Sequence, residues 1–204
     1  MLIDLRILHK KYNLNINGII HIGAHYGEEN NVYRELNINN IVYVEPIKST
    51  YDILVDSTKD NKNTLYFNTA LGTFTGKTMM NMSSNRNTSA SILKPKNHLY
   101  LSPNVKFQGE VEVNIDLLDN LEFNREDYNM INIDVQGYEL EVFKGAKNTL
   151  KNIDYIMSEV NRDYLYKGCA LVEEVDEFLS SFGFERSETF WAGGTWGDAL
   201  YIKK

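Results

Sequence analysis

Cysteine, proline and long apolar runs are all scarce in this chain of 204 residues. The single cysteine, Cys169, has no partner for an internal disulfide and no companions for a cysteine-type metal site, so we interpret it as a small, partly buried residue. With three prolines and no low-complexity linker, the chain offers no point at which to divide it. We therefore expect one domain over residues 1–204.

No apolar run is long enough to span a membrane. The N-terminal stretch "MLIDLRILHKKYNLNING" mixes charges among its apolar residues and lacks the uninterrupted core of a signal peptide. It predicts a short amphipathic helix packed on the domain, and we expect the protein to be cytoplasmic. Nothing in the sequence indicates the oligomeric state.

Positive charge is scarce as well: the formal net charge is −7, and the lysines and arginines form no stripe. Nucleic-acid binding normally needs a basic surface, so a long duplex is not expected as a partner, although a groove for a short RNA stays open. Apolar residues make up 43% of the chain, which suffices for a packed core.

Strand-like and helix-like segments alternate through most of the chain. Such alternation predicts an α/β fold with a mainly parallel, doubly wound sheet, whose ligands bind beyond the carboxyl ends of the strands. The last two strands are expected to pair as an antiparallel hairpin. The predicted strands are 18–23, 40–46, 64–71, 128–137, 153–160, 182–190 and 197–204, and the predicted helices are 28–36, 49–60 (starting at a Ser-x-x-Asp motif at Ser49), 138–150 and 171–182.

Residues 73–116 break this alternation. The stretch 76–95 is polar and rich in serine and asparagine, and 105–118 alternates like an exposed strand. We interpret 73–116 as a polar insertion with short strands and a mobile loop. Its segment "SSNRNTSASIL" (83–93) is either a solvated loop or a cover over the site that hydrogen-bonds a polyhydroxylated ligand.

The stretch "IIHIGAHYGEE" (19–29) predicts a strand that turns tightly into a helix. Gly23 and Gly27 permit a close approach of a ligand to the backbone, and the helix start adds free N–H groups. Glu45 ends the next strand about twenty residues further on, where a carboxylate binds a ribose diol. His25 replaces the middle glycine of a dinucleotide loop, and no phosphate-binding P-loop motif is present. These features favour S-adenosylmethionine over ATP or NAD.

The stretch "NIDVQGYELEVFKGA" (132–146) is the most specific in the sequence. It closely resembles the Ile-Asp-Val-Glu-Gly-x-Glu-x-x-x-Leu-x-Gly-Ala signature of FkbM-type S-adenosylmethionine-dependent methyltransferases. The stretches "IIHIGAHYGEE", "VYVEP", "NTALGTFTGK" and "NTSASIL" resemble the rest of that family in the expected order, so that the resemblance spans about residues 18–160.

The resemblance implies a class I methyltransferase fold with a seven-stranded sheet, S-adenosylmethionine as cofactor and O-methylation of a hydroxyl on a sugar, glycan or other small metabolite. Asp134 would face the methyl donor or the acceptor. Two departures stand out: His21 replaces the first acid of the family's glycine loop, and Gln136 replaces its Val-Glu-Gly glutamate. Glu28 is the candidate to replace the lost acid, although the helix dipole explains it equally well. The implied cofactor-binding residues are Gly23, Ala24, His25, Gly27, Glu28, Glu45, Pro46, Thr69, Ala70, Leu71 and Asp134.

A hydroxyl acceptor needs a general base. Asp134 is the first candidate and His25 the second, followed by Glu159 and His98, whereas His21 is expected to be a core residue and His9 a surface residue. Asp134, Glu139 and Glu159 in principle suit a divalent cation, but without a close acidic pair we expect no metal. The stretch "FWAGGTWGD" (190–198) is either an aromatic acceptor platform or a packed hairpin.

Two other functions stay open on the sequence alone. An NAD-dependent oxidoreductase shares the glycine loop and the ribose acid, but this chain lacks the third spaced glycine and a Tyr-x-x-x-Lys pair. The other is a noncatalytic nucleoside- or sugar-binding module with the same fold.

Overall fold

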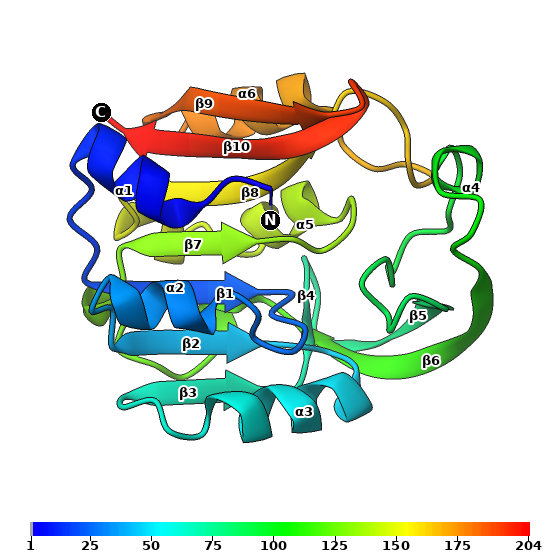
Figure 1. Cartoon of the computed structure of the whole chain (residues 1–204), viewed down its shortest axis with the longest axis horizontal. Helices are drawn as coiled ribbons and strands as arrows, with labels where there is room; N and C mark the ends of the chain where they lie inside the picture. The colour runs from blue at the N-terminus through cyan, green and yellow to red at the C-terminus, as the bar shows by residue number, and fades with distance from the viewer. Residues whose placement is uncertain (1) are drawn as a thin grey trace.

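A seven-stranded, mainly parallel sheet forms the centre of the computed structural model, which describes residues 2–204 (Figure 1). The strand order is β3-β2-β1-β7-β8-β10-β9. β10 pairs antiparallel with both β8 and β9, whereas the other pairs are parallel. The predicted fold and the C-terminal antiparallel hairpin are therefore confirmed. The strands are β1 (Gly18–Ile22), β2 (Asn40–Val44), β3 (Thr64–Phe67), β7 (Met130–Ile133), β8 (Tyr155–Asn161), β9 (Phe184–Ala192) and β10 (Trp196–Lys203).

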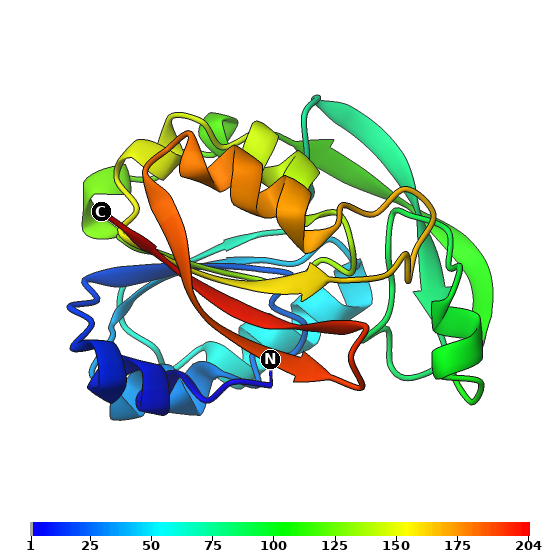
Figure 2. The same ribbon diagram turned by 90° about the horizontal axis from the view of Figure 1, so that it is seen from above.

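Helices cover both faces of this sheet (Figure 2). One face carries α1 (Leu5–Tyr12), α2 (Asn30–Glu35) and α3 (Lys48–Thr58), and the other carries α5 (Glu139–Lys144) and α6 (Val172–Ser180). Successive side chains of β1 alternate between the two cores: Ile19 packs with the α1–α3 cluster and Ile20 with the α5–α6 cluster. This double burial explains why the central strands are apolar on both faces.

The N-terminal helix α1 has the predicted amphipathic character. Leu5 and Leu8 are buried, and the Asp4 side chain accepts a hydrogen bond from the Arg6 N–H at the helix start. Asn13 ends the helix in the left-handed conformation, with φ of 51°. Among residues 2–204, the structure has no helix of the length and apolar character needed to cross a bilayer.

Two sequence-based boundaries need correction at the ends of helices. Helix α3 starts at Lys48 after Ile47, so Ser49 lies inside the helix rather than capping it. The predicted helix 138–150 is shorter than expected, because α5 ends at Lys144. A Cβ on Gly145 would overlap the carbonyl oxygen of Gly72, so the chain leaves the helix where two backbones touch.

The predicted strand 64–71 is two strands in two sheets. β3 ends at Phe67, and β4 (Ala70–Leu71) pairs with β6 in the smaller sheet. Between them, the Asn68 side-chain amide donates to the carbonyl oxygens of Glu45 and Pro46. This contact bends the chain away from the large sheet at a point that local periodicity does not mark.

The region predicted as an insertion, 73–116, contributes two of the three strands of a small second sheet, of order β4-β6-β5. It comprises β5 (Gly76–Ser83) and β6 (Phe107–Asp116), and α4 (His98–Leu101) lies in the connection between them. Figure 1 shows this sheet beyond the carboxyl ends of β1 and β2. The strand predicted over 105–118 is confirmed as β6.

Candidate active site

A cavity of about 380 Å³ opens at the carboxyl ends of β1, β2 and β7. Gly27 does not line it, because that glycine packs under Leu54 and Thr58 of α3. Asn87, Thr88, Ala90 and Ile92 also face the cavity, so the 83–93 segment covers it rather than forming a wholly solvated loop. The predicted cofactor residues that line the cavity are Gly23, Ala24, His25, Glu28, Glu45, Pro46, Thr69, Ala70, Leu71 and Asp134.

The turn after β1 is held by the neighbouring strands. The N–H groups of Gly23 and Ala24 both donate to the carbonyl of Val44, at 3.0 and 3.1 Å. Gly23 has φ of +75°, and a Cβ at this position would overlap the carbonyl oxygen of Asp134. Glycine is therefore required both by the left-handed backbone and by the closeness of β7.

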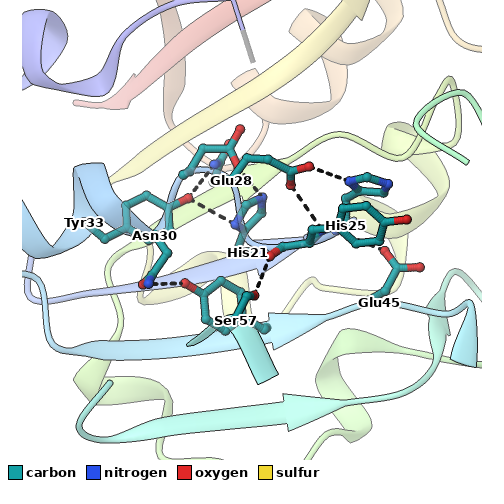
Figure 3. Close-up of polar contacts among 11 residues, drawn as sticks. His21, His25, Glu28, Asn30, Tyr33, Glu45 and Ser57 are labelled. Carbon is teal, nitrogen blue, oxygen red and sulfur yellow. Dashed lines mark hydrogen bonds and ion pairs between the residues drawn. The ribbon is translucent and has the colours of Figure 1, made fainter. Parts of the chain in front are cut away.

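Glu45 is a buried carboxylate at the wall of the cavity (Figure 3). Its side chain accepts hydrogen bonds from the Ile47 N–H at 2.9 Å and the His25 N–H at 3.1 Å, one on each oxygen. Each carboxylate oxygen has a further lone pair for a ligand. Burial raises the pKa of Glu45 to about 7, because the backbone donors only partly offset the loss of hydration.

His25 contacts Glu28 (Figure 3) and also reaches the covering segment at Arg86. Its Nδ1 lies 2.7 Å from a carboxylate oxygen of Glu28, and its Nε2 lies 2.8 Å from the carbonyl oxygen of Arg86. Burial lowers the pKa of His25, but the hydrogen bonds to Glu28 and Arg86 outweigh it and the pKa is raised. Both partners only accept hydrogen bonds, so the ring carries a proton on each nitrogen and has no lone pair free to act as a base.

Glu28 lies before helix α2 rather than in its first turn, because the helix begins at Asn30 and not at residue 28 as predicted. Glu28 accepts from His25 and from the Tyr26 N–H at 3.1 Å, and it lines the cavity. His21 is 2% exposed, and its Nδ1 lies 3.2 Å from the Tyr33 hydroxyl, which confirms it as a core residue. Burial lowers the pKa of His21. Glu29 also lines the cavity, with a carboxylate oxygen 3.9 Å from His21 Nε2, and sequence reasoning missed it.

Three carboxyl groups gather behind the end of β7. Asp134, Glu139 and Glu159 each offer an oxygen within 4.8 Å of the others. Glu139 accepts from the N–H groups of Val135 and Gly137, at 3.0 and 3.1 Å, and so stabilises the turn before α5. Burial raises the pKa of Glu139 and, with the neighbouring acids, raises that of Glu159 well above its usual range. The absence of a metal stays a prediction.

Gln136 joins two of these carboxyl groups, and sequence reasoning gave it no role. Its side-chain amide donates to Asp134 at 2.7 Å and to Glu159 at 2.8 Å, and its Oε1 lies 2.8 Å from the Tyr166 hydroxyl. The one signal in the sequence was the departure from the family's glutamate. Asp134 and Gln136 line the cavity, whereas Glu139 and Glu159 lie behind them.

The remaining candidates lie away from the cavity wall. His98 is buried at the start of α4, and its Nε2 lies 3.1 Å from the Ser89 hydroxyl. The Arg162 guanidinium lies over the ring of Trp191, 3.8 Å from the ring centroid. Trp196 packs against the buried residues Leu165, Tyr166 and Cys169. The two tryptophans belong to the β9–β10 hairpin, which supports the packed-hairpin interpretation.

These buried acids predict an unusual dependence of stability on pH. Because the folded pKa values of Glu45, Glu139 and Glu159 are raised, the folded chain holds protons that the unfolded chain releases near pH 4.5. The stabilising contribution of Glu45 and Glu139 is therefore fully present below pH 4.5 and is lost as the pH rises through about 7. Glu159, with its pKa raised well above the usual range, acts in the same direction. We expect the ligand-free protein to lose at least about 1 kcal/mol between pH 5 and pH 8, or roughly 2–4 °C in Tm.

Differential scanning calorimetry across this range measures the effect. Glu159→Gln is expected to raise Tm at pH 8 and to flatten the pH slope, because a neutral amide needs no proton. Glu126→Gln changes an exposed acid and serves as the matched control. A Tm that rises from pH 5 to pH 8 would contradict the assignment of protons to the buried acids.

Comparison with known proteins identifies the family. The model of the methyltransferase FkbM domain matches residues 21–186. The 2-O-methyltransferase NoeI of Sinorhizobium fredii is 36% identical over 96 residues, a match that spans 46% of this chain and 40% of that protein. The chain thus aligns with less than half the length of this relative.

Solved structures share the fold at low sequence identity. The magnesium protoporphyrin IX methyltransferase ChlM from Synechocystis, with bound S-adenosylmethionine, has a TM-score of 0.56 at 8% identity, covering 98% of this chain and 76% of its own. An S-adenosylmethionine-dependent methyltransferase from Aquifex aeolicus has a TM-score of 0.55 at 10% identity, covering 98% and 90%. Membership in a methyltransferase family confirms the predicted cofactor, S-adenosylmethionine. The chain belongs to the FkbM family of S-adenosylmethionine-dependent methyltransferases.

Proposed function

We propose that this methyltransferase modifies a hydroxyl group of a sugar or another small polyhydroxylated metabolite. The observation that carries the proposal is the placement of two carboxylates, Glu45 and Asp134, on the wall of one cavity that also contains the glycine turn. One carboxylate suits the ribose of the donor, and the other suits the proton of an acceptor hydroxyl. The likeness to a 2-O-methyltransferase supports oxygen as the acceptor atom.

The residues of the cavity fit S-adenosylmethionine. A cavity of about 380 Å³ lies within the range typical of small-molecule sites, roughly 300–1,000 Å³. Glu45 has lone pairs left for the ribose hydroxyls, and Gly23 leaves room beside the backbone. Pro46, Ala70 and Leu71 add an apolar wall suited to the adenine ring. When bound, S-adenosylmethionine supplies an electrophilic methyl group.

The protein's own groups orient the acceptor and remove its proton. Asp134 lies at the cavity wall and is proposed to take the hydroxyl proton as the oxygen becomes a methyl ether. His25 is the weaker candidate, because both of its ring nitrogens already donate to Glu28 and Arg86. The covering segment 83–93 brings Asn87 and Thr88 to the cavity wall, and polar residues of this kind suit a hydroxylated acceptor.

Ligand-induced stabilisation tests the cofactor. S-adenosylhomocysteine is expected to raise Tm in a concentration-dependent way, whereas NAD is expected to leave it unchanged. Stabilisation by NAD alone would instead favour an oxidoreductase. A transfer screen with labelled S-adenosylmethionine and free monosaccharides then separates an enzyme from a noncatalytic binding module and identifies a usable acceptor.

Glu45→Gln is expected to weaken S-adenosylhomocysteine binding by about tenfold or more, since a hydrogen bond to a charged group contributes roughly 1.5–3 kcal/mol. The wild-type affinity is expected to rise from pH 6 to pH 8, because Glu45 ionises near pH 7 and the carboxylate accepts more strongly. Isothermal titration calorimetry measures both effects. Glu126→Gln is the control, and an unchanged affinity in Glu45→Gln would show that the ribose assignment is wrong.

A further inference from the structure

Gln136 is held in one orientation by groups on three sides. The Tyr166 hydroxyl lies 2.8 Å from Gln136 Oε1 and 2.9 Å from the carbonyl oxygen of Ser89, and its proton is shared between these acceptors. The Ser91 hydroxyl donates to the Gln136 carbonyl oxygen at 2.8 Å. The backbone of Gln136 is left-handed, with φ of 56°. In this orientation the amide oxygen meets the Tyr166 hydroxyl, and the amide nitrogen points toward Asp134 and Glu159.

The amide nitrogen has two protons, and both have acceptors. One proton goes to Asp134 Oδ1 at 2.7 Å, and the other goes to Glu159 Oε2 at 2.8 Å. Glu159 Oε1 is buried and has no hydrogen-bond partner within residues 2–204. Glu159 is 3% exposed, whereas Asp134 reaches the cavity, so burial favours the proton on Glu159. The amide thus hydrogen-bonds both carboxyl groups at once and ties the direction of Asp134 to that of Glu159.

We propose that Gln136 is a positioning residue that fixes the direction of the Asp134 side chain for proton removal. The family's glutamate at this position would add a fourth carboxyl group among Asp134, Glu139 and Glu159. That group needs a proton to coexist with its neighbours. With glutamine, this chain has one titratable group fewer beside the proposed base.

Charged and titratable groups from every neighbouring element interact electrostatically with this carboxyl cluster. The variants below change none of these residues. They are His21 of β1, Glu139 of α5, Glu159 of β8, Tyr166 and Cys169 of the 162–171 loop, and Asp198 of β10.

The first test does not depend on methyl transfer. In protein with ¹³C-labelled carboxyl groups, NMR counts the protonated side chains at pH 7. Gln136→Glu is expected to show one protonated carboxyl group more than the wild type, because the added acid shares the site of Glu159. Ser91→Ala removes the hydrogen bond to the backbone of Gln136 but keeps the amide, so its count is expected to match the wild type. An unchanged count in Gln136→Glu overturns the proposal.

The second test rests on the proposed function and uses the monosaccharide found in the transfer screen. In Gln136→Glu, the acidic limb of kcat against pH is expected to move up by at least about one pH unit, with recovery at high pH. In Gln136→Met, kcat is expected to fall by about tenfold or more at every pH, a part of the roughly 10²–10⁴-fold effect of a general base. S-adenosylhomocysteine affinity stays within about twofold in both variants, which shows that the site is folded.

The outcomes separate this proposal from the proposed function. An acidic limb at the same pH in Gln136→Glu, or full kcat in Gln136→Met, overturns the role of Gln136. Loss of wild-type transfer on chelation with EDTA and its return with Mg²⁺ also overturns it, because the carboxyl groups would then hold a cation. If the wild type transfers no methyl group to any hydroxyl, the proposed function fails, and the NMR count alone decides the role of Gln136.

Discussion

Asp134→Asn is expected to lower kcat for methyl transfer by roughly 10²–10⁴-fold, the contribution typical of a general base. The asparagine has the same shape, and its oxygen can still accept the hydrogen bond from the Gln136 amide. Asp134→Asn therefore removes the proposed general base with little change in packing. The affinity for S-adenosylhomocysteine is expected to stay within a few-fold, because the ribose contact belongs to Glu45.

Single-turnover kinetics with labelled S-adenosylmethionine measure this change without interference from product release. Asp127→Asn, on the exposed 3₁₀ helix Arg125–Asp127, is the matched control and is expected to keep full activity. Full activity in Asp134→Asn would mean that the base lies elsewhere. Glu159 would then be the next group to test, because it belongs to the same cluster.

Gly23→Ala is expected to destabilise the protein by about 2–6 kcal/mol and to abolish cofactor binding. The added methyl group meets the carbonyl oxygen of Asp134, and the alanine must also adopt φ of +75°. Overpacking costs roughly 1–3 kcal/mol, and a left-handed non-glycine residue costs roughly 1–3 kcal/mol more. The overlap can be relieved only if the chain moves apart after β1 and β7, where the glycine turn faces the cavity. This movement would distort the cofactor site.

Gly109→Ala is a matched control for this prediction. Gly109 has φ of +79°, close to that of Gly23, but a Cβ at position 109 would meet no atom within 4 Å. The loss of stability in Gly109→Ala therefore measures only the cost of placing alanine in a left-handed backbone conformation. Urea denaturation gives the stability of both variants, and calorimetry gives their affinity for S-adenosylhomocysteine. Equal losses of stability in the two variants would show that the contact between Gly23 and Asp134 is unimportant.

The central fold was predictable because burial dictates it. Strands β1, β2, β7 and β8 are covered on both faces, so they are rich in apolar residues and stand out in the sequence. The end of β3 was not predictable, because the chain bends there through contacts of the Asn68 side chain with Glu45 and Pro46. Local patterns contain no record of such contacts between distant residues.

The candidate site likewise has features that the sequence predicts and features that it does not. Gly23, Glu45 and Asp134 follow strands, and strand ends of a parallel sheet meet at one edge, so their grouping was predictable. The state of His25 was not, because it depends on the carbonyl of Arg86, 61 residues away. The orientation of Gln136 depends in the same way on Tyr166, 30 residues further along the chain.

Transfer of a ¹³C-labelled methyl group from S-adenosylmethionine to free sugars tests the central claim most directly. Two-dimensional NMR of the products identifies the atom that receives the label. We predict a methyl ether on one sugar hydroxyl, formed by the wild-type protein and lost in Asp134→Asn. A label on nitrogen, or no transfer by protein that binds S-adenosylhomocysteine, would contradict the claim.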